Sequence, residues 1–177
     1  EIDAFAERTD ALVANLGMLD EARRAALTRA LPIVARRGMP WVLDPVKVER
    51  SPARLAFARE LLAFAPAVVR ANRAEMDALA PDPGQVRAAT AEVDLVEADG
   101  RKLRVGGGDP LMACVTAMGC AGTGLVAAFV AVEPDPFAAT VAALTCLKVA
   151  GEIAGEEARG PGSFPAAFLD ALRSEEH

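Results

Sequence analysis

A glycine-rich segment and a lone cysteine near an expected helix start are the residues best suited to chemistry. Residues 106–109 read Gly-Gly-Gly-Asp, and Cys120 stands in the first turn of a small-residue helix that runs to Val132. Unpaired backbone N–H groups and the positive end of the helix dipole gather at such a start, which suits a phosphate or a developing oxyanion. The same dipole favours the thiolate form of a cysteine. A proton acceptor beside an anion cradle indicates phosphoryl transfer to an alcohol.

A structural interpretation of the same residues stays open. Glycine, alanine and cysteine at a helix start also allow a helix to pack closely on a sheet. A glycine-rich loop alone is weak evidence for a phosphate site, so neither interpretation is preferred on these residues.

Polar residues at the ends of two expected strands are further candidates. Asp44 follows the apolar run Trp-Val-Leu, and Asn72 and Glu75 follow a run that ends at Arg70. Ligands collect at the carboxyl ends of parallel strands. Carboxylates there suit Mg²⁺ held through water, and an arginine suits phosphate oxygens. Alternatively, Asp44 and Asn72 could cap turns or helices, and Glu75 could complement a helix dipole. Arg70 could be a solvated charge.

Alternating apolar runs and amphipathic stretches predict a mostly parallel sheet flanked by helices. Strands are expected at 11–17, 40–44 and 67–70, and helices at 20–37, 51–64 and 73–79. An Asp-Gly turn at 99–100 predicts a hairpin of strands 92–96 and 102–105. After the glycine-rich segment only helices are expected, at 118–132, 135–157 and 164–173. No strand is predicted within 80–89, and no linker divides residues 1–177, so we expect one domain.

Composition excludes several classes of protein. A net charge of −6 and an isoelectric point near 4.9 argue against a nucleic-acid partner. Three cysteines without paired spacing predict neither disulfides nor a zinc site, so we expect a reduced, cytoplasmic protein. The only histidine, His177, suggests a linker or tag remnant. Residues 111–132 carry no charge but contain glycines and threonines, which favours a buried loop and core helix over a membrane span.

Six motifs in order resemble the hydroxyethylthiazole kinase family, which has the ribokinase-like fold. They are Pro-Trp-Val-Leu-Asp-Pro-Val at 40–46, Arg-Ala-Asn-Arg-Ala-Glu at 70–75, Thr-Ala-Glu-Val-Asp at 90–94, Gly-Gly-Asp-Pro-Leu-Met at 107–112, Thr-Ala-Met-Gly-Cys at 116–120 and Gly-Pro-Gly-Ser-Phe at 160–164. The resemblance implies a three-layer α/β fold with a mostly parallel central sheet. It also implies phosphorylation of 4-methyl-5-(2-hydroxyethyl)thiazole with ATP and Mg²⁺, in thiamine biosynthesis and salvage.

The same resemblance implies eight site residues and an assembly. Arg70 and Thr90 would contact ATP, and Asp44 and Glu75 would hold Mg²⁺ mostly through water. Four consecutive residues would line the anion hole beside the thiazole hydroxyl: Ala117, Met118, Gly119 and Cys120. Of these, Cys120 stands where the wider superfamily has an aspartate base. A homotrimer with active sites shared between subunits is implied as well.

Departures from the family pattern leave alternatives open. Ala117 and Met118 replace a glycine and a threonine of the family. The family's first strand, helix and thiazole-contacting loop have no counterpart before Glu1, and its helix and strand are absent near 80–90. We therefore expect that the sequence lacks an N-terminal segment and an internal segment of a longer protein. A non-catalytic relative that binds nucleotide or thiazole, or a hydroxymethylpyrimidine kinase, remains an alternative.

Overall fold

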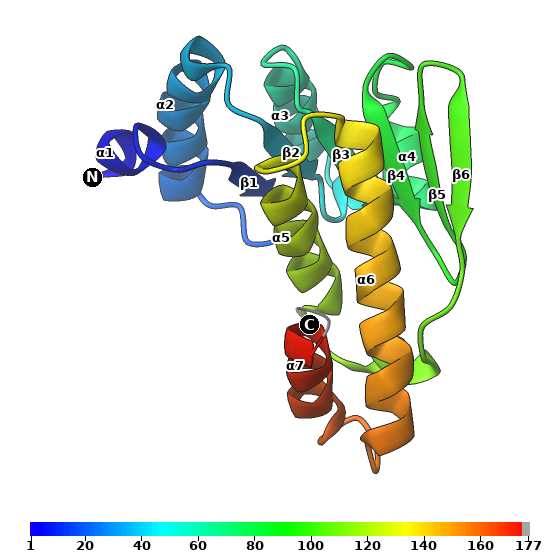
Figure 1. Ribbon diagram of the computed structural model, residues 1–177. Coiled ribbons are helices and arrows are strands. Elements are labelled where there is room, and N and C mark those ends of the chain that lie inside the picture. The colour runs from blue at the N-terminus through cyan, green and yellow to red at the C-terminus, as the bar shows by residue number, and fades with distance from the viewer. Residues whose placement is uncertain (175–177) are drawn as a thin grey trace.

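One six-stranded sheet runs through the computed structural model, in which residues 1–174 are described (Figure 1). The strands lie in the sheet in the order of the sequence. Four are mutually parallel: β1 (Leu12–Asn15), β2 (Trp41–Asp44), β3 (Val68–Asn72) and β4 (Val86–Thr90). The hairpin of β5 (Asp94–Ala98) and β6 (Arg101–Val105) extends the sheet antiparallel at one edge, as the Asp-Gly turn predicts. His177 lies outside the described residues.

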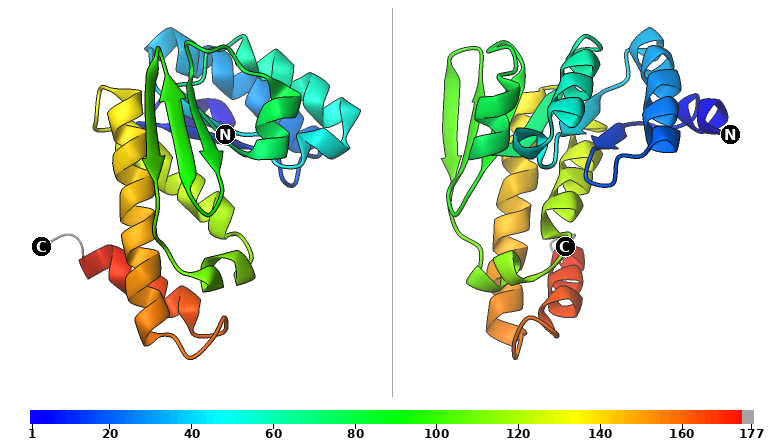
Figure 2. Two further views of the ribbon diagram at one scale, coloured as in Figure 1. Left: turned by 90° about the vertical axis from the view of Figure 1, so that its right-hand side faces the viewer. Right: turned by 180° about the vertical axis from the view of Figure 1, so that it is seen from behind.

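Helices cover both faces of the sheet and make three layers (Figure 2). One layer consists of α2 (Glu21–Arg37), α3 (Pro52–Leu62) and α4 (Arg73–Leu79), with the short α1 (Ile2–Ala6) beside α2. The other layer consists of α5 (Met118–Val130) and α6 (Pro136–Glu157), and α7 (Phe164–Ser174) packs against α6. Two short 3₁₀ turns, η1 (Val48–Arg50) and η2 (Pro110–Cys114), lie in the connections.

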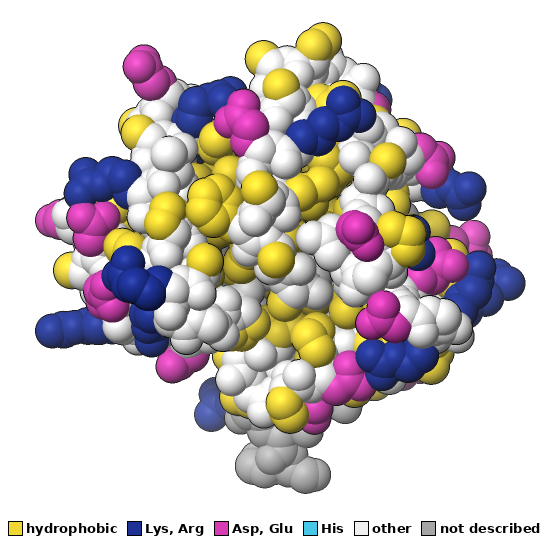
Figure 3. All heavy atoms as spheres, turned by 90° about the horizontal axis from the view of Figure 1, so that it is seen from above, with side chains coloured by type: hydrophobic (Ala, Val, Ile, Leu, Met, Phe, Trp, Pro, Cys, Tyr) yellow, Lys and Arg dark blue, Asp and Glu magenta, His cyan; other side chains and the backbone are white. Residues whose placement is uncertain are grey.

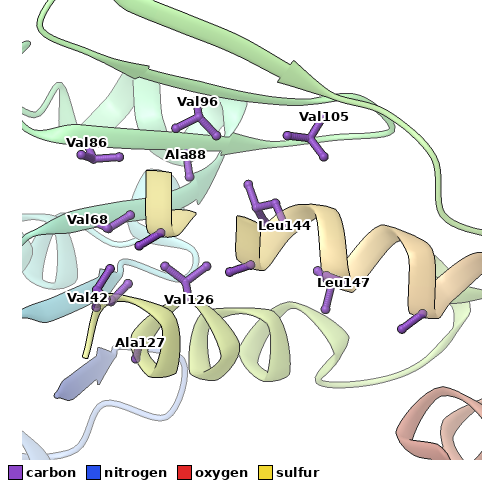
Figure 4. Packing of buried hydrophobic residues seen from close by; sticks show 14 of the residues in the cluster. Val42, Val68, Val86, Ala88, Val96, Val105, Val126, Ala127, Leu144 and Leu147 are labelled. Atoms are coloured by element: carbon purple, nitrogen blue, oxygen red, sulfur yellow. The ribbon is translucent and has the colours of Figure 1, made fainter. Parts of the chain in front are cut away.

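Strand alternation divides the core between these layers. Val42 and Val68 face α5 and α6 in one buried cluster (Figure 4). Their neighbours Leu43 and Val69 point to the opposite face and pack with residues of α2 and α3. Because successive side chains of a strand point to opposite faces, one of two consecutive apolar residues packs into each of the two buried clusters. The first residues of β2 and β3 are therefore apolar on both faces, and the polar residues of these strands come toward their carboxyl ends.

Local signals fix the helix boundaries near their predicted positions. Asp20 caps α2 by accepting the Arg23 N–H at 2.7 Å, and the helix ends at Gly38 in the left-handed conformation, with φ 63°. Ser51 caps α3 by accepting the Arg54 N–H at 3.3 Å. These caps set where the chain turns back toward the sheet.

The strand β4 corrects the prediction that residues 80–89 contain none. Val86 and Ala88 are buried on the α6 side, and β4 pairs with β3 on one side and with β5 on the other. The segment escaped prediction because it is short and its alanines carry little strand preference. The sheet is thus continuous from β1 to β6.

The uncharged stretch 111–132 is divided between η2, a short loop and α5, in agreement with the expected loop and core helix. Among residues 1–174, α6 alone is long and apolar enough to cross a membrane, and 56% of its most apolar window is buried inside the fold.

The two ends of the sheet differ in character. Figure 3 looks onto the end opposite the start of α5, where hydrophobic side chains gather at the centre and charged ones lie around them. A groove at that end has a volume of about 520 Å³ and includes Trp41, Phe64 and Val130 in its lining. Buried charged residues lie instead where the parallel strands end, and the candidate site is at that end.

Candidate functional site

A cleft of about 820 Å³ opens at the carboxyl ends of the parallel strands. Its walls come from the end of β3, the β4–β5 connection, the glycine-rich segment, the start of α5 and the middle of α6. Predicted residues among its lining are Arg70, Thr90, Met118 and Gly119. The topology therefore brings both ATP-contact candidates and two of the four anion-hole candidates to one cleft, while Ala117 and Cys120 lie outside its lining.

Asp44 is a buried carboxylate with one oxygen fully engaged. Its Oδ2 accepts hydrogen bonds from Asn15 Nδ2 and from Thr123 Oγ1, both at 2.8 Å. Burial raises the pKa of Asp44, and the Thr123 hydrogen bond and the Arg70 charge oppose that rise. Within residues 1–174, Oδ1 accepts no hydrogen bond. That oxygen is free for a hydrated cation, which would favour the ionised carboxylate.

Glu75 is also buried, but backbone N–H groups occupy both of its oxygens. Oε1 accepts the N–H of Lys47 at 2.7 Å, and Oε2 accepts the N–H of Asn72 at 2.9 Å. Asn72 Oδ1 in turn accepts the Glu75 N–H, which completes a capping box at the start of α4. The structural explanations of Asn72 and Glu75 are therefore correct, and Glu75 holds the loop that follows β2.

The donor set fits a cation held through water and does not fit a closed protein cage. The part of the chain that the structure describes has no cluster of three or more acidic, histidine or cysteine side chains that could hold a metal. Mg²⁺ usually retains several waters and binds one or two carboxylates together with substrate phosphates. Asp44, which has one free oxygen, and Glu75, whose oxygens keep lone pairs, fit this mode of Mg²⁺ binding.

Arg70 is buried, so its interpretation as a solvated surface charge is wrong. Its Nη1 donates to the Gly119 carbonyl at 2.7 Å and to Thr123 Oγ1 at 3.1 Å. Burial lowers the pKa of Arg70, while the charges of Asp44 and other acids oppose the decrease. A Cβ at Gly122 would lie 2.8 Å from Arg70 Nη2. The guanidinium therefore joins the end of β3 to the first turns of α5, and glycine makes room for it.

The start of α5, where the sequence predicts an anion cradle, leaves backbone N–H groups without an acceptor among residues 1–174. The first hydrogen bond of the helix runs from the Ala121 N–H to the Ala117 carbonyl at 2.9 Å. Within the described residues, the backbone N–H groups of Met118, Gly119 and Cys120 donate to no acceptor. Three free N–H groups and the helix dipole converge there. Ala117 precedes them in the left-handed conformation, with φ 68°. This conformation is unfavourable for residues other than glycine.

The glycine-rich segment serves packing and does not feed this helix directly. η2 and residues 115–117 separate it from α5. Gly107 and Gly108 have φ of 93° and 86°, and the Gly108 N–H donates to Glu152 Oε1 on α6 at 3.2 Å. A Cβ at Gly107 would lie 2.5 Å from that Glu152 oxygen. Gly107 and Gly108 therefore allow close packing on α6, whereas a Cβ at Gly106 would meet nothing within 4 Å; Gly107 and Gly108 also line the cleft.

Cys120 is exposed at the cradle, and an asparagine that sequence reasoning missed contacts its sulfur. Asn15 Nδ2 donates to Cys120 Sγ at 3.3 Å as well as to Asp44 Oδ2. Asn15 ends β1 as Asp44 ends β2, so the strand-end rule applied to Asp44 would have found it. Thr123, which links Asp44 to Arg70, carried no signal because it lies inside a run of small helix residues.

Thr90, the last residue of β4, lines the same cleft as Met118 and Gly119 at the start of α5. Its Oγ1 donates to the Ala71 carbonyl at 3.3 Å. The connection after Thr90 is held by a buried lysine on α6 that the sequence did not single out. Lys148 Nζ lies 3.6 Å from Asp94 Oδ2 and donates to the carbonyls of Ala91 and Glu92 at 3.2 and 2.9 Å. A lysine in an apolar helix gives no sign of its partner in sequence.

Comparison with known proteins agrees with this architecture. The family model described as "Hydroxyethylthiazole kinase family" matches residues 1–88 and 77–176. The chain belongs to the hydroxyethylthiazole kinase family. A probable hydroxyethylthiazole kinase of Agrobacterium fabrum is 46% identical over 172 residues, which cover 97% of this chain and 70% of that protein. The other curated relatives matched include a hydroxyethylthiazole kinase of Granulibacter bethesdensis, 39% identical over 198 residues, which cover 97% of this chain and 72% of the relative.

Solved structures confirm the fold of this member of the hydroxyethylthiazole kinase family. The hydroxyethylthiazole kinase protein of Pyrococcus horikoshii OT3 superposes with a TM-score of 0.92 at 33% identity, covering 97% of this chain and 74% of that chain. A ribokinase-like superfamily protein of Enterococcus faecalis V583 gives a TM-score of 0.71 at 16% identity, covering 98% and 66%. The predicted ribokinase-like, three-layer α/β fold is thus correct.

Proposed function

We propose that this hydroxyethylthiazole kinase family member transfers the γ-phosphoryl group of ATP to the hydroxyl of 4-methyl-5-(2-hydroxyethyl)thiazole, in thiamine biosynthesis and salvage. The observation that supports it best is the set of three free N–H groups at Met118, Gly119 and Cys120 beside an exposed thiol. Such a cradle stabilises charge on a transferred phosphoryl group. The 820 Å³ cleft beside it is of the size that small ligands occupy.

The proposed step is an in-line displacement at the γ-phosphorus. The Cys120 thiolate accepts the proton of the alcohol, and the alcohol oxygen forms a bond to the γ-phosphorus. The bond from that phosphorus to the oxygen bridging to the β-phosphate breaks, and ADP leaves with the electron pair. The N–H groups of Met118, Gly119 and Cys120 stabilise the equatorial oxygens. Positioning and electrostatics supply the remaining acceleration.

Arg70 and Thr90 are proposed contacts of the nucleotide, since both line the cleft. Asp44 and Glu75 would hold Mg²⁺ through water, and the cation would neutralise charge on the phosphates. The free Asp44 oxygen supports this assignment. Arg70 also contributes indirectly, because its bond to the Gly119 carbonyl fixes the first turn of α5 and with it the direction of the cradle N–H groups.

A homotrimer with shared active sites is also proposed. An apolar groove of about 460 Å³ continues from Ala117 and Met118 between α5 and α7, and Leu169 at its side is 66% exposed. An exposed apolar surface beside the site is what a shared site needs. Sedimentation of the purified protein measures the assembly directly.

A cytoplasmic location is supported by the three free cysteines, and the proposed partners are only the alcohol, ATP and other copies of the chain.

The decisive experiment follows ADP release from Mg-ATP by the full-length protein. Hydroxyethylthiazole is supplied first and hydroxymethylpyrimidine second, with the Cys120→Ala variant in parallel. Release that depends on the thiazole and falls in the variant supports the proposal. ADP release that depends only on hydroxymethylpyrimidine would identify that alcohol, and not the thiazole, as the substrate. A folded protein that responds to neither alcohol would be a non-catalytic relative, which no observation at the site favours.

A further inference from the structure

We propose that Asn15 is a positioning residue that holds the Cys120 sulfur for proton transfer. This inference rests on the proposed function, because it assigns a task to the group that would accept the proton. The Asn15 carboxamide joins three separate elements, since it ends β1, contacts Asp44 at the end of β2 and contacts Cys120 in the first turn of α5. The contact with sulfur spans 105 residues of sequence.

The orientation of the carboxamide is fixed by a third contact. Asn15 Oδ1 accepts the N–H of Gly17 at 2.9 Å, so Nδ2 has to face the other way, toward Asp44 and Cys120. A Cβ at position 17 would lie 2.9 Å from Oδ1, so a glycine lets the chain after β1 approach this closely. Each N–H of Nδ2 then has one acceptor, Asp44 Oδ2 at 2.8 Å or Cys120 Sγ at 3.3 Å.

A donor 3.3 Å from Sγ gives the Cys120 sulfur one preferred position beside the end of β1. It thereby restricts the side chain of Cys120, which is otherwise exposed. Asp44 anchors the donor, because its Oδ2 is held in turn by Thr123. The amide thus couples the placement of the sulfur to the carboxylate on the metal side of the site. An asparagine can do this, whereas an aspartate would present a second acceptor to both groups.

The test is the alkylation rate of Cys120 by iodoacetamide, followed by peptide mass spectrometry without ATP or alcohol. In the isosteric variant Asn15→Asp, we expect alkylation to slow by about tenfold, because the hydrogen bond to Sγ is lost and a carboxylate takes the place of the donor. Cys114 and Cys146 are internal references and should react as in the wild type. Asn72→Asp is the matched control, because Asn72 ends β3 but makes no contact with Cys120. It should leave Cys120 reactivity unchanged.

Steady-state kinetics separate positioning from folding. Asn15→Asp and Asn15→Leu should both lower kcat by about tenfold or more, with the KM for ATP changed little and the melting temperature retained. Wild-type alkylation of Cys120 in folded Asn15→Asp would overturn the inference, even if kcat fell. Should the wild type fail to phosphorylate the thiazole, the proposed function fails, while the alkylation experiment still decides whether Asn15 controls the sulfur.

Discussion

The start of α5 and the glycine-rich segment 106–109 resemble each other in sequence and differ in what their backbone does. Both are rich in small residues. Among the residues that the structure describes, the N–H groups of Met118, Gly119 and Cys120 at the start of α5 have no acceptor. Gly108, in contrast, donates its N–H to Glu152, and Gly107 and Gly108 lie closely on α6. Small residues permit either arrangement. The start of α5 adds the positive end of a helix dipole to its free donors, so we expect it to be the better placed of the two regions to bind an anion.

The largest effect is expected from removing the thiol at the free-donor region. Cys120→Ala should lower kcat for the thiazole alcohol by about 10²- to 10⁴-fold, as for loss of a general base. The melting temperature should change little because the side chain is exposed. Cys114→Ala, on η2, is the matched control with nearly wild-type turnover. Equal turnover in both variants would remove Cys120 from the chemistry and leave the cradle as the only contribution of α5.

A substitution in the packed region should instead affect stability. Gly108→Ala places a Cβ 2.9 Å from Met112 Sδ and 3.1 Å from the Lys148 Cδ, at a φ of 86°. We expect a loss of about 1–3 kcal/mol in the free energy of unfolding. Gly106→Ala is the control within the same segment, because a Cβ there meets nothing within 4 Å and φ lies outside the left-handed region. Urea denaturation of the two variants distinguishes packing from a general intolerance of side chains.

The buried charge near the cradle gives a pH-dependent prediction. Burial raises the pKa of Asp44 above its ordinary value of 3.8, so the folded state binds a proton more tightly than the unfolded state. Asp44 therefore lowers stability as pH rises from 3.8 through the raised pKa. Asp44→Asn should abolish kinase activity yet raise the melting temperature at pH 7.

The gain from Asp44→Asn should shrink toward pH 4, where both states of Asp44 become protonated. Melting curves between pH 4 and 8 measure this difference. Asp77→Asn, in an exposed ion pair, serves as the control and should show little dependence. A gain from Asp44→Asn that is constant with pH would show that burial of the charge is not its cause.

The smallest effect is expected where the cradle itself is strained. Ala117 adopts φ 68° before the helix, so Ala117→Gly should increase the free energy of unfolding by about 0.5–1 kcal/mol. Ala121→Gly, one turn further along the same helix, should decrease it by about 1 kcal/mol because the residue is helical. Thermal denaturation of both variants compares the two positions. If both glycines destabilise equally, the left-handed conformation at Ala117 costs nothing.

The sequence predicted most of the elements and the residues at strand ends, because those depend on local signals. Asp44 and Arg70 follow apolar runs, and Ser51 and Asp20 mark helix starts. The strand β4 was missed because its alanines give no pattern. The contacts of Glu75 with the backbone N–H groups of Lys47 and Asn72 were not predicted, because they depend on the conformation of the chain after β2 and not on residue type.

Long-range contacts explain the other misses. Asn15 and Thr123 contribute to the site through hydrogen bonds to other elements. Asn15 and its partner Cys120 are 105 residues apart, and Thr123 and its partner Asp44 are 79 residues apart. A single sequence reports the type of each residue but not these pairings. The packing of Gly107 and Gly108 on α6 is a further long-range contact that their local sequence pattern does not predict.

The order of strands in the sheet also sets an order of assembly. Because strand order equals sequence order, the neighbour that precedes each strand in the sheet is synthesised before it, so each pairing joins segments that are adjacent in the chain. Cys120 meets Asn15 only after α5 has docked across β1 and β2. All six strands of this sheet are therefore synthesised before the Cys120–Asn15 contact can form.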